Sequence, residues 1–123
     1  MTRTTFCLSP GDLVYQFLGC FDDKKGDRAL RELLENRRGE IDWPNTYKTS
    51  QLKSFLDSCA NEAKGENYNY FALQFYGECY SDTDTWASAN YNKHGPSSEF
   101  VTDLSGTYYA GGANTNCVYQ LVQ

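Results

Sequence analysis

Candidate ligand-binding groups are concentrated in the polar stretch of residues 81–98 (SDTDTWASANYNKHGPSS). Aromatic and hydrogen-bonding side chains occur together within nine of these residues: Trp86, Asn90, Tyr91, Asn92, Lys93 and His94. Sugar sites pack an aromatic ring against the apolar face of a pyranose and place polar groups beside its hydroxyls. The stretch therefore predicts a carbohydrate-binding site. The competing interpretation is a solvated loop with Trp86 packed at its base.

The same stretch opens with a D-x-D pair that could contribute to a calcium site. Ca²⁺ takes roughly six to eight hard oxygen ligands, and sugar hydroxyls can supply some of them. The protein oxygens on offer are those of Asp82, Asp84, Asn90 and a carboxylate such as Asp103 or Glu99. The alternative is a turn with an Asx hydrogen bond, since the EF-hand spacing is absent.

A glycine- and asparagine-rich segment near the C-terminus is a further candidate. Residues 111–116 (GGANTN) could bring backbone amides and the Asn114 side chain near a ligand. A plain turn explains the segment equally well.

Catalytic motifs are not found in the sequence. His94 is the only histidine, and neither G-x-S-x-G nor H-E-x-x-H occurs. Two carboxylates could form a glycosidase site, but among 16 acidic residues some pair will always be close. We therefore expect a binding protein and not an enzyme.

The five cysteines indicate disulfides in an oxidising compartment. They include no C-x-x-C pair, so zinc and redox motifs are unsupported. Four of them can form two disulfides, which favours a secreted or cell-surface protein. Cys7, in a polar Thr-rich leader, is the expected odd cysteine and could link two chains into a homodimer.

Charge and hydropathy exclude two classes of partner. Sixteen acidic against eleven basic residues give a net charge of -5, which disfavours nucleic acid. No apolar run approaches the roughly 20 residues of a membrane span, so we expect no membrane insertion. The first residues lack the apolar stretch of a signal peptide, so either the chain is not exported or its signal has been removed.

The elements that must position these groups form an α+β domain. We expect a small antiparallel sheet with one or two helices packed on it, stabilised by disulfides. The predicted strands are a buried one at residues 14–21, a central one at 68–76, a short one at 100–104 and a closing one at 117–122. The predicted helices are residues 28–38 and 51–64, and residues 22–26 and 81–98 are expected as a charged turn and a long loop. Residues 1–13 are an N-terminal leader and residues 14–123 a single domain.

The positions of the cysteines in these elements suggest a pairing. Cys59 lies on the apolar face of the predicted helix and Cys79 just past the central strand, so this pair would join helix to sheet. Cys20 and Cys117 lie in the first and last strands. Four cysteines still allow three pairings.

Several motifs resemble the WSC-type extracellular domain. They are residues 19–23 (GCFDD), 28–30 (RAL), 59–60 (CA), 70–74 (YFALQ), 77–80 (GECY) and 118–119 (VY). Residues 41–43 (IDW) and 75–80 (FYGECY) are similar to an invertebrate branch found in corals and sea anemones. The resemblance covers nearly the whole chain, from about Gln16 to Leu121.

The resemblance implies a disulfide-bonded module, related to PAN/apple domains, that binds carbohydrate outside cells. It implies a lectin for galactose-type sugars with possible calcium dependence, and it adds Glu78 of the GECY motif to the candidate sugar-binding residues. Ser81 stands where the family usually has a further cysteine, and the family's later cysteine-rich segment is absent. The alternative function is a protein-interaction or structural module of the extracellular matrix.

Overall fold

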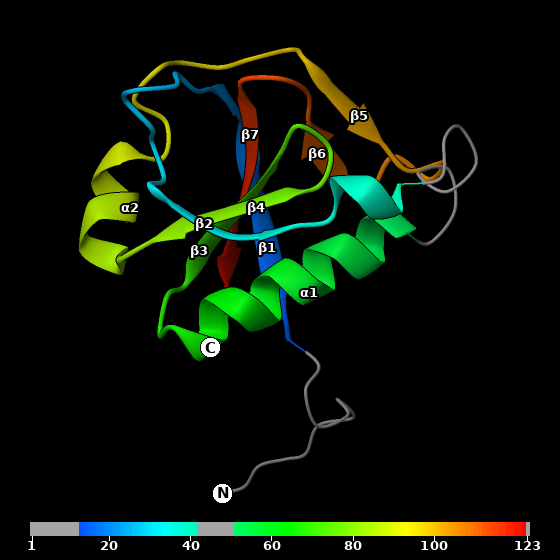
Figure 1. The fold of residues 1–123 in the computed structure, drawn as a ribbon, viewed down its shortest axis with the longest axis horizontal. Coiled ribbons are helices and arrows are strands. Elements are labelled where there is room, and N and C mark those ends of the chain that lie inside the picture. Colours follow the sequence, from blue (N-terminus) through cyan, green and yellow to red (C-terminus); the bar gives the residue numbers. More distant parts are fainter. Residues whose placement is uncertain (1–12, 42–50, 123) are drawn as a thin grey trace, which may run out of the picture.

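A computed structural model describes residues 13–41 and 51–122 and shows an α+β fold, as predicted (Figure 1). The elements follow in the order β1 (Tyr15–Asp22), β2 (Glu32–Asn36), η1 (Arg38–Glu40), α1 (Gln51–Gly65), β3 (Tyr70–Gln74), β4 (Glu78–Asp82), α2 (Asp84–Asn90), β5 (Phe100–Thr102), β6 (Tyr109–Gly111) and β7 (Thr115–Leu121). The leader and Cys7 lie outside the described residues, apart from Leu13.

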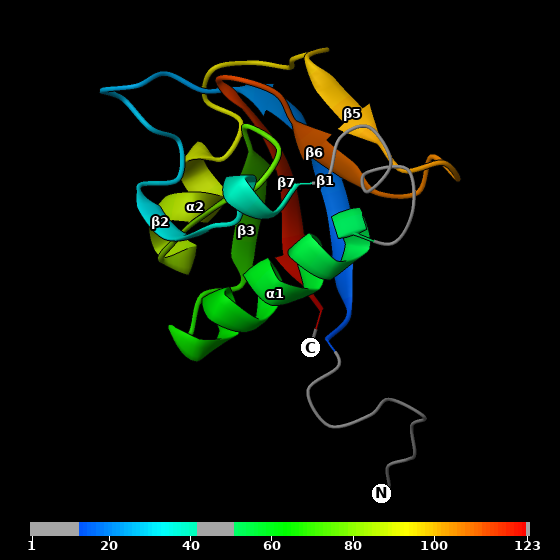
Figure 2. The ribbon, with the colours of Figure 1, turned by 45° about the vertical axis from the view of Figure 1, so that its right-hand side comes forward.

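An antiparallel five-stranded sheet in the order β1-β7-β3-β4-β2 forms the centre of the molecule. The strand predicted at residues 68–76 is β3, which lies in the middle of this sheet. The strand predicted at 117–122 is β7, next to β3. A separate hairpin of β5 and β6 lies beside the sheet, above one end of α1 (Figure 2).

Helices cover opposite faces of the sheet. Phe71 and Leu73 of β3 belong to the apolar cluster that contains the buried face of α1, whereas Ala72 packs in a second cluster with Ala87 of α2. Successive side chains of a strand point to opposite faces, which explains this division. Both faces of β3 are therefore covered, as its continuous apolar sequence predicts.

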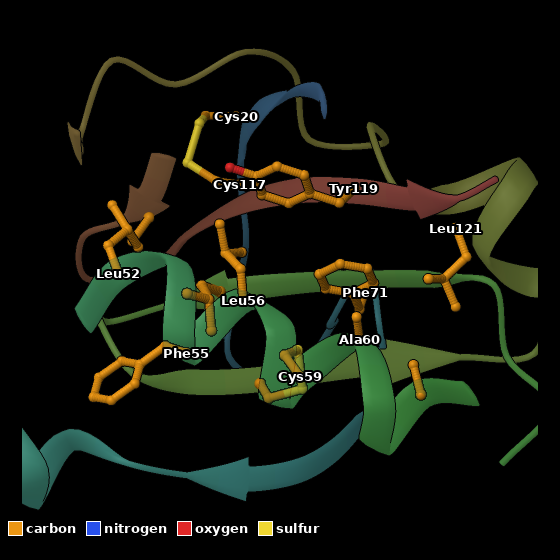
Figure 3. Packing of buried hydrophobic residues seen from close by; sticks show 14 residues of the cluster. Cys20, Leu52, Phe55, Leu56, Cys59, Ala60, Phe71, Cys117, Tyr119 and Leu121 are labelled. Carbon is orange, nitrogen blue, oxygen red and sulfur yellow. A yellow bond between two sulfur atoms is a disulfide. The ribbon is translucent and has the colours of Figure 1, made fainter. Parts of the chain in front are cut away.

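The strongest predicted helix is confirmed as α1. Its buried side chains recur at three- and four-residue spacing: Leu52, Phe55, Leu56, Cys59, Ala60 and Ala63. They face Phe71 and Tyr119 across the helix–sheet interface (Figure 3). Gly65 is the last residue of the helix.

Both predicted disulfides are present. Cys59 of α1 is bonded to Cys79 of β4, which joins the helix to the sheet. Cys20 and Cys117 are directly opposite each other in the β1–β7 pair, so their bond links the first and last strands (Figure 3). The Cys20–Cys117 disulfide joins two residues that are 97 positions apart in the sequence.

The helix predicted at residues 28–38 is wrong. Ala29 and Leu30 are buried in an irregular segment, and residues 32–36 form edge strand β2, which pairs with β4. Leu33 is 50 % exposed, so the leucines of the apparent helical face do not share one buried side. A helix of about three turns is only marginally stable by itself, and the hydrogen bonds of β2 with β4 stabilise the strand instead.

The long loop predicted at residues 81–98 is also wrong in its first half. Ser81 and Asp82 complete β4, and α2 follows directly, with Thr83 as its N-cap. The Thr83 hydroxyl accepts a hydrogen bond from the backbone N–H of Trp86 at 3.3 Å. Thr83 followed by Asp84 is a typical start of a helix. It is hard to recognise here because the whole stretch is polar.

Three smaller predictions need correction. The strand predicted at residues 14–21 is edge strand β1 (Tyr15–Asp22), in which Phe17 is 39 % exposed, and it is not buried as expected. Gly111 ends strand β6 and does not lie in a turn. Asp23, expected in a solvated charged turn, is 4 % exposed and accepts hydrogen bonds from Arg28 and the backbone of Ala29.

No helix in the described ranges is long and apolar enough to cross a membrane. The two disulfides are consistent with an oxidising environment such as the cell exterior.

Candidate functional site

Most of the predicted sugar-binding residues gather around α2, against the segment between β1 and β2. Lys93 Nζ donates a hydrogen bond to Asp27 Oδ1 at 2.9 Å, and this bond holds the pKa of Asp27 below its usual range. His94 Nε2 lies 2.8 Å from the Asp27 carbonyl oxygen, and its side chain is 7 % exposed. Asn92 lies exposed in the turn after α2.

The aromatic rings of this group pack against the protein itself. Trp86 Nε1 donates to the Ala29 carbonyl oxygen at 2.8 Å, and the Arg31 guanidinium lies 3.7 Å from the centre of the Trp86 ring. Tyr91 packs against the rings of Phe21 and Tyr70. These contacts tie α2 to the sheet, and one face of the Trp86 ring is covered by arginine.

Asn90 follows the same pattern. Its side-chain Nδ2 donates to the Trp86 carbonyl oxygen at 2.8 Å, closing the last turn of α2. The residues predicted as a sugar platform at 86–94 therefore make many internal contacts, and their role in sugar binding stays a prediction.

The predicted calcium ligands are bonded to separate groups. Asp82, 1 % exposed, accepts hydrogen bonds from the Arg31 guanidinium at 2.8 and 3.0 Å and from its backbone N–H at 2.9 Å. Burial acts to raise the pKa of Asp82, but the hydrogen bonds from Arg31 and Thr83 outweigh it, so the pKa lies below its usual value. Asp84 accepts instead from the backbone and side chain of Asn69.

Asp103 lies in the β5–β6 turn, where it accepts from the backbone N–H groups of Thr107 and Tyr108. Burial opposes these bonds, yet they hold the pKa of Asp103 below its usual value. Across residues 13–41 and 51–122 no group of three or more His, Cys, Asp or Glu side chains is arranged to hold a metal ion.

Glu78 and Asn114 lie outside α2. Glu78 starts β4 and Asp82 ends it, so the two are about 13 Å apart along the strand. Asn114 has a φ of 57° in the β6–β7 turn, and its carbonyl oxygen accepts from the Asp23 backbone N–H. The structure therefore does not unite Glu78 with residues 86–94, whereas the Asn114 backbone lies near Gly95, because the neighbouring Asp22 N–H donates to the Gly95 carbonyl oxygen.

A cavity of about 350 Å³ lies at the end of β4 where Glu78 is found. It is lined by Arg38, Ile41, Phe75, Tyr76 and Val101, and we refer to it as the Phe75 cavity. This volume falls at the lower end of the range of small-molecule sites. Of the described residues, those in its wall are mainly apolar and aromatic, and the charged one is Arg38.

The turn between β3 and β4 places the two aromatic residues of the cavity. Phe75 and Tyr76 have φ angles of 49° and 72°, a conformation that costs a non-glycine residue of order 1–3 kcal/mol. Their backbone N–H groups donate to the carbonyl oxygens of Gly112 and Gly111 at 3.0 and 2.9 Å, which holds the turn against the β6–β7 connection. Such conformations cluster at functional sites.

Element η1 places Arg38 against this turn. The Arg37 backbone N–H donates to the Gly77 carbonyl oxygen at 2.8 Å. The Arg38 guanidinium carbon then lies 3.5 Å from the centre of the Phe75 ring, and Arg38 Nη1 lies 4.0 Å from Glu78 Oε2. An aromatic ring and a cation therefore meet at the cavity, and the Glu78 carboxylate lies beside the cation.

Of the residues at this cavity, only Glu78 beside it is a candidate site residue from the sequence. Phe75 and Tyr76 were expected to extend the central strand, because they continue its apolar run. The available signal was length: residues 68–76 exceed an ordinary strand of five or six residues, and Gly77 follows them. A turn at residues 75–77 agrees with both features.

No protein-family model matches the chain, and no curated protein matches it. The resemblance to WSC-type domains consequently rests on the motifs in the sequence.

Proposed function

We propose that this protein is an extracellular carbohydrate-binding module, a lectin for small galactose-type sugars, with its site at the Phe75 cavity. The observation that carries the proposal is the combination of two aromatic residues, Phe75 and Tyr76, with Arg38 in one small cavity. An aromatic wall suits the apolar face of a pyranose, and a few charged groups beside it fix the hydroxyls.

The strained turn supports this choice of site over the α2 group. Phe75 and Tyr76 hold an unfavourable backbone conformation at the cavity, whereas the Trp86 indole N–H is bonded to the Ala29 carbonyl oxygen. Trp86 and Tyr91 are therefore expected to stabilise α2, and Phe75 to contact ligand.

A glycan array followed by titration calorimetry tests the proposal. We expect binding to galactose-type glycans and a loss of up to about tenfold in affinity for Phe75→Leu, which keeps an apolar side chain but removes the ring. Lys25→Gln, in the exposed turn after β1, is the matched control. Trp86→Phe distinguishes the two sites, because a platform at α2 predicts weaker sugar binding for that variant as well.

The same array tests the calcium prediction and the alternative function. A calcium-bridged site predicts that a chelator abolishes binding and that Asp84→Asn does the same. Absence of binding to any glycan, with or without calcium, would contradict the proposal and favour a protein-interaction or matrix module.

We further propose that Cys7 links two copies of the chain. The other four cysteines are paired in the two disulfides, which leaves Cys7 as the odd one. Two linked copies would raise the avidity of a weak sugar site. Non-reducing gel electrophoresis should show a dimer that disappears on reduction and in Cys7→Ser, and a monomer alone would contradict this.

A further inference from the structure

Arg38 differs from the other arginines of the described residues in its hydrogen bonding. Within residues 13–41 and 51–122 its guanidinium donates no hydrogen bond, and its closest carboxylate oxygen, on Glu78, is 4.0 Å away. Only its backbone N–H donates, to Asn36 Oδ1 at 3.0 Å. The side chain is 43 % exposed, so a ligand can reach it.

The other three arginines within residues 13–41 and 51–122 are occupied by acceptors of the protein. Arg28 donates hydrogen bonds to Asp23 and Gln74, and Arg31 forms a bidentate ion pair with Asp82. Arg37 donates hydrogen bonds to Glu40 and Ser58 and forms an ion pair with Glu35. Their roles are structural, and among the arginines that the structure describes Arg38 is the one whose guanidinium N–H groups remain available at a cavity.

Arg38 is also held in place for binding. Its guanidinium stacks on Phe75 at 3.5 Å, and η1, which it begins, is joined to the β3–β4 turn through Arg37 and Gly77. A guanidinium fixed by its face presents its N–H groups at its edge, in the planar fork that matches a carboxylate. A carboxylate can accept two parallel hydrogen bonds from the guanidinium, whereas a neutral hydroxyl accepts one.

We propose that the Phe75 cavity selects a galactose-type sugar that carries a carboxylate, a uronic acid, and that Arg38 is the residue that recognises it. This inference rests on the proposed sugar-binding function and assigns its substrate class. The sugar ring would contact Phe75, and its ionised carboxylate would accept hydrogen bonds from Arg38. Glu78, 16 % exposed, carries the same charge as such a ligand and weakens the attraction.

Galactose and galacturonic acid are suitable probes, because they differ only at C6, which is a hydroxymethyl group in galactose and a carboxylate in galacturonic acid. We expect the wild-type protein to bind galacturonic acid about tenfold more tightly at pH 7, in line with a charge-assisted hydrogen bond. Arg38→Gln should remove this preference, and added salt should reduce it.

Two further variants keep the test independent of folding defects. Glu78→Gln removes the competing negative charge and should strengthen binding of galacturonic acid relative to galactose. Lys25→Gln, far from the cavity in the exposed turn, should leave both affinities unchanged. Thermal unfolding of each variant identifies any that fail to fold.

The failures of the two proposals can be told apart. If galactose binds as tightly as galacturonic acid, or if the acid preference persists in Arg38→Gln, the acidic-sugar inference is wrong and the sugar-binding proposal stands. If neither sugar binds and the glycan array is empty, both are wrong.

Discussion

Asp82 shows how single residues are stabilised in this protein. Its carboxylate is 1 % exposed, yet both of its oxygens are bonded, by the forked guanidinium and backbone of Arg31 and by the backbone of Thr83. The pair joins the segment before β2 to the end of β4. Partners of this kind cannot be read from local sequence, because 51 positions separate Asp82 from Arg31.

We predict that Asp82→Asn lowers the free energy of unfolding by about 1–2 kcal/mol at pH 7, through loss of charge-assisted hydrogen bonds. The pKa of Asp82 is depressed in the folded protein, so its contribution is complete above the ordinary aspartate value of about 3.9. It is lost as the pH falls through the lower, folded value. The variant should therefore lose less stability than the wild type between pH 5 and pH 2.

Urea unfolding at several pH values measures this difference. Asp22→Asn, an exposed carboxylate at the end of β1, is the control and should follow the wild type. Parallel pH profiles for Asp82→Asn and the wild type would show that the Arg31 pair contributes nothing to acid sensitivity.

At the scale of elements, long and strongly patterned segments were predictable and short ones were not. The 15-residue helix α1 and the apolar strands β3 and β7 follow from their own periodicity. Strand β2 has only five residues and is held by β4, and α2 has only seven and is held by contacts with Ala29 and Arg31. Their structure depends on partners that are distant in the sequence, so the hydrophobic pattern of the segment itself does not predict it.

The same dependence explains why the Phe75 cavity could not be predicted. It is assembled from η1, the β3–β4 turn and β5, which are far apart in the sequence. Gly77 is central to this assembly, because a methyl group there would lie 3.0 Å from the backbone nitrogen of Arg38 and 3.1 Å from the backbone carbon of Arg37. Glycine allows η1 to approach the turn.

We predict that Gly77→Ala destabilises the protein by about 1–3 kcal/mol, because backbone must move to relieve the crowding. It should also weaken sugar binding, since the same movement shifts Arg38 away from Phe75. Calorimetric titration together with thermal unfolding measures both effects. Gly39→Ala is a close control, because nothing lies within 4 Å of a methyl group at Gly39. Equal stability of the two variants would contradict the role assigned to Gly77.

At the scale of the whole molecule, the composition is explained mainly by the core. The aromatic content of 15 % supplies side chains that pack on the sheet, including Phe71 and Tyr119, whose rings stack 5.5 Å apart. The Tyr119 hydroxyl is held by the backbone of Tyr109, which connects the β5–β6 hairpin to the sheet. The sequence predicted this core and its disulfides because apolar alternation and cysteine positions report burial directly.

The two disulfides constrain the chain over very different lengths, which leads to a prediction for global stability. The Cys20–Cys117 and Cys59–Cys79 bonds have sequence separations of 97 and 20 residues. In the chain-entropy model they stabilise the fold by roughly 4–5 and 3 kcal/mol, because closing the longer loop restricts the unfolded chain more. We therefore expect Cys20→Ala/Cys117→Ala to be less stable than Cys59→Ala/Cys79→Ala.

Urea unfolding of the two double variants, followed by circular dichroism, gives their free energies of unfolding under identical conditions. Each pair also removes buried sulfur atoms: Cys59, Cys79 and Cys117 are each 0 % exposed, and Cys20 is 8 % exposed. The loss of packing is therefore similar in the two variants, and loop entropy is expected to decide their order. If Cys59→Ala/Cys79→Ala is the less stable variant, packing between α1 and β4 contributes more to the fold than the constraint that joins its first and last strands.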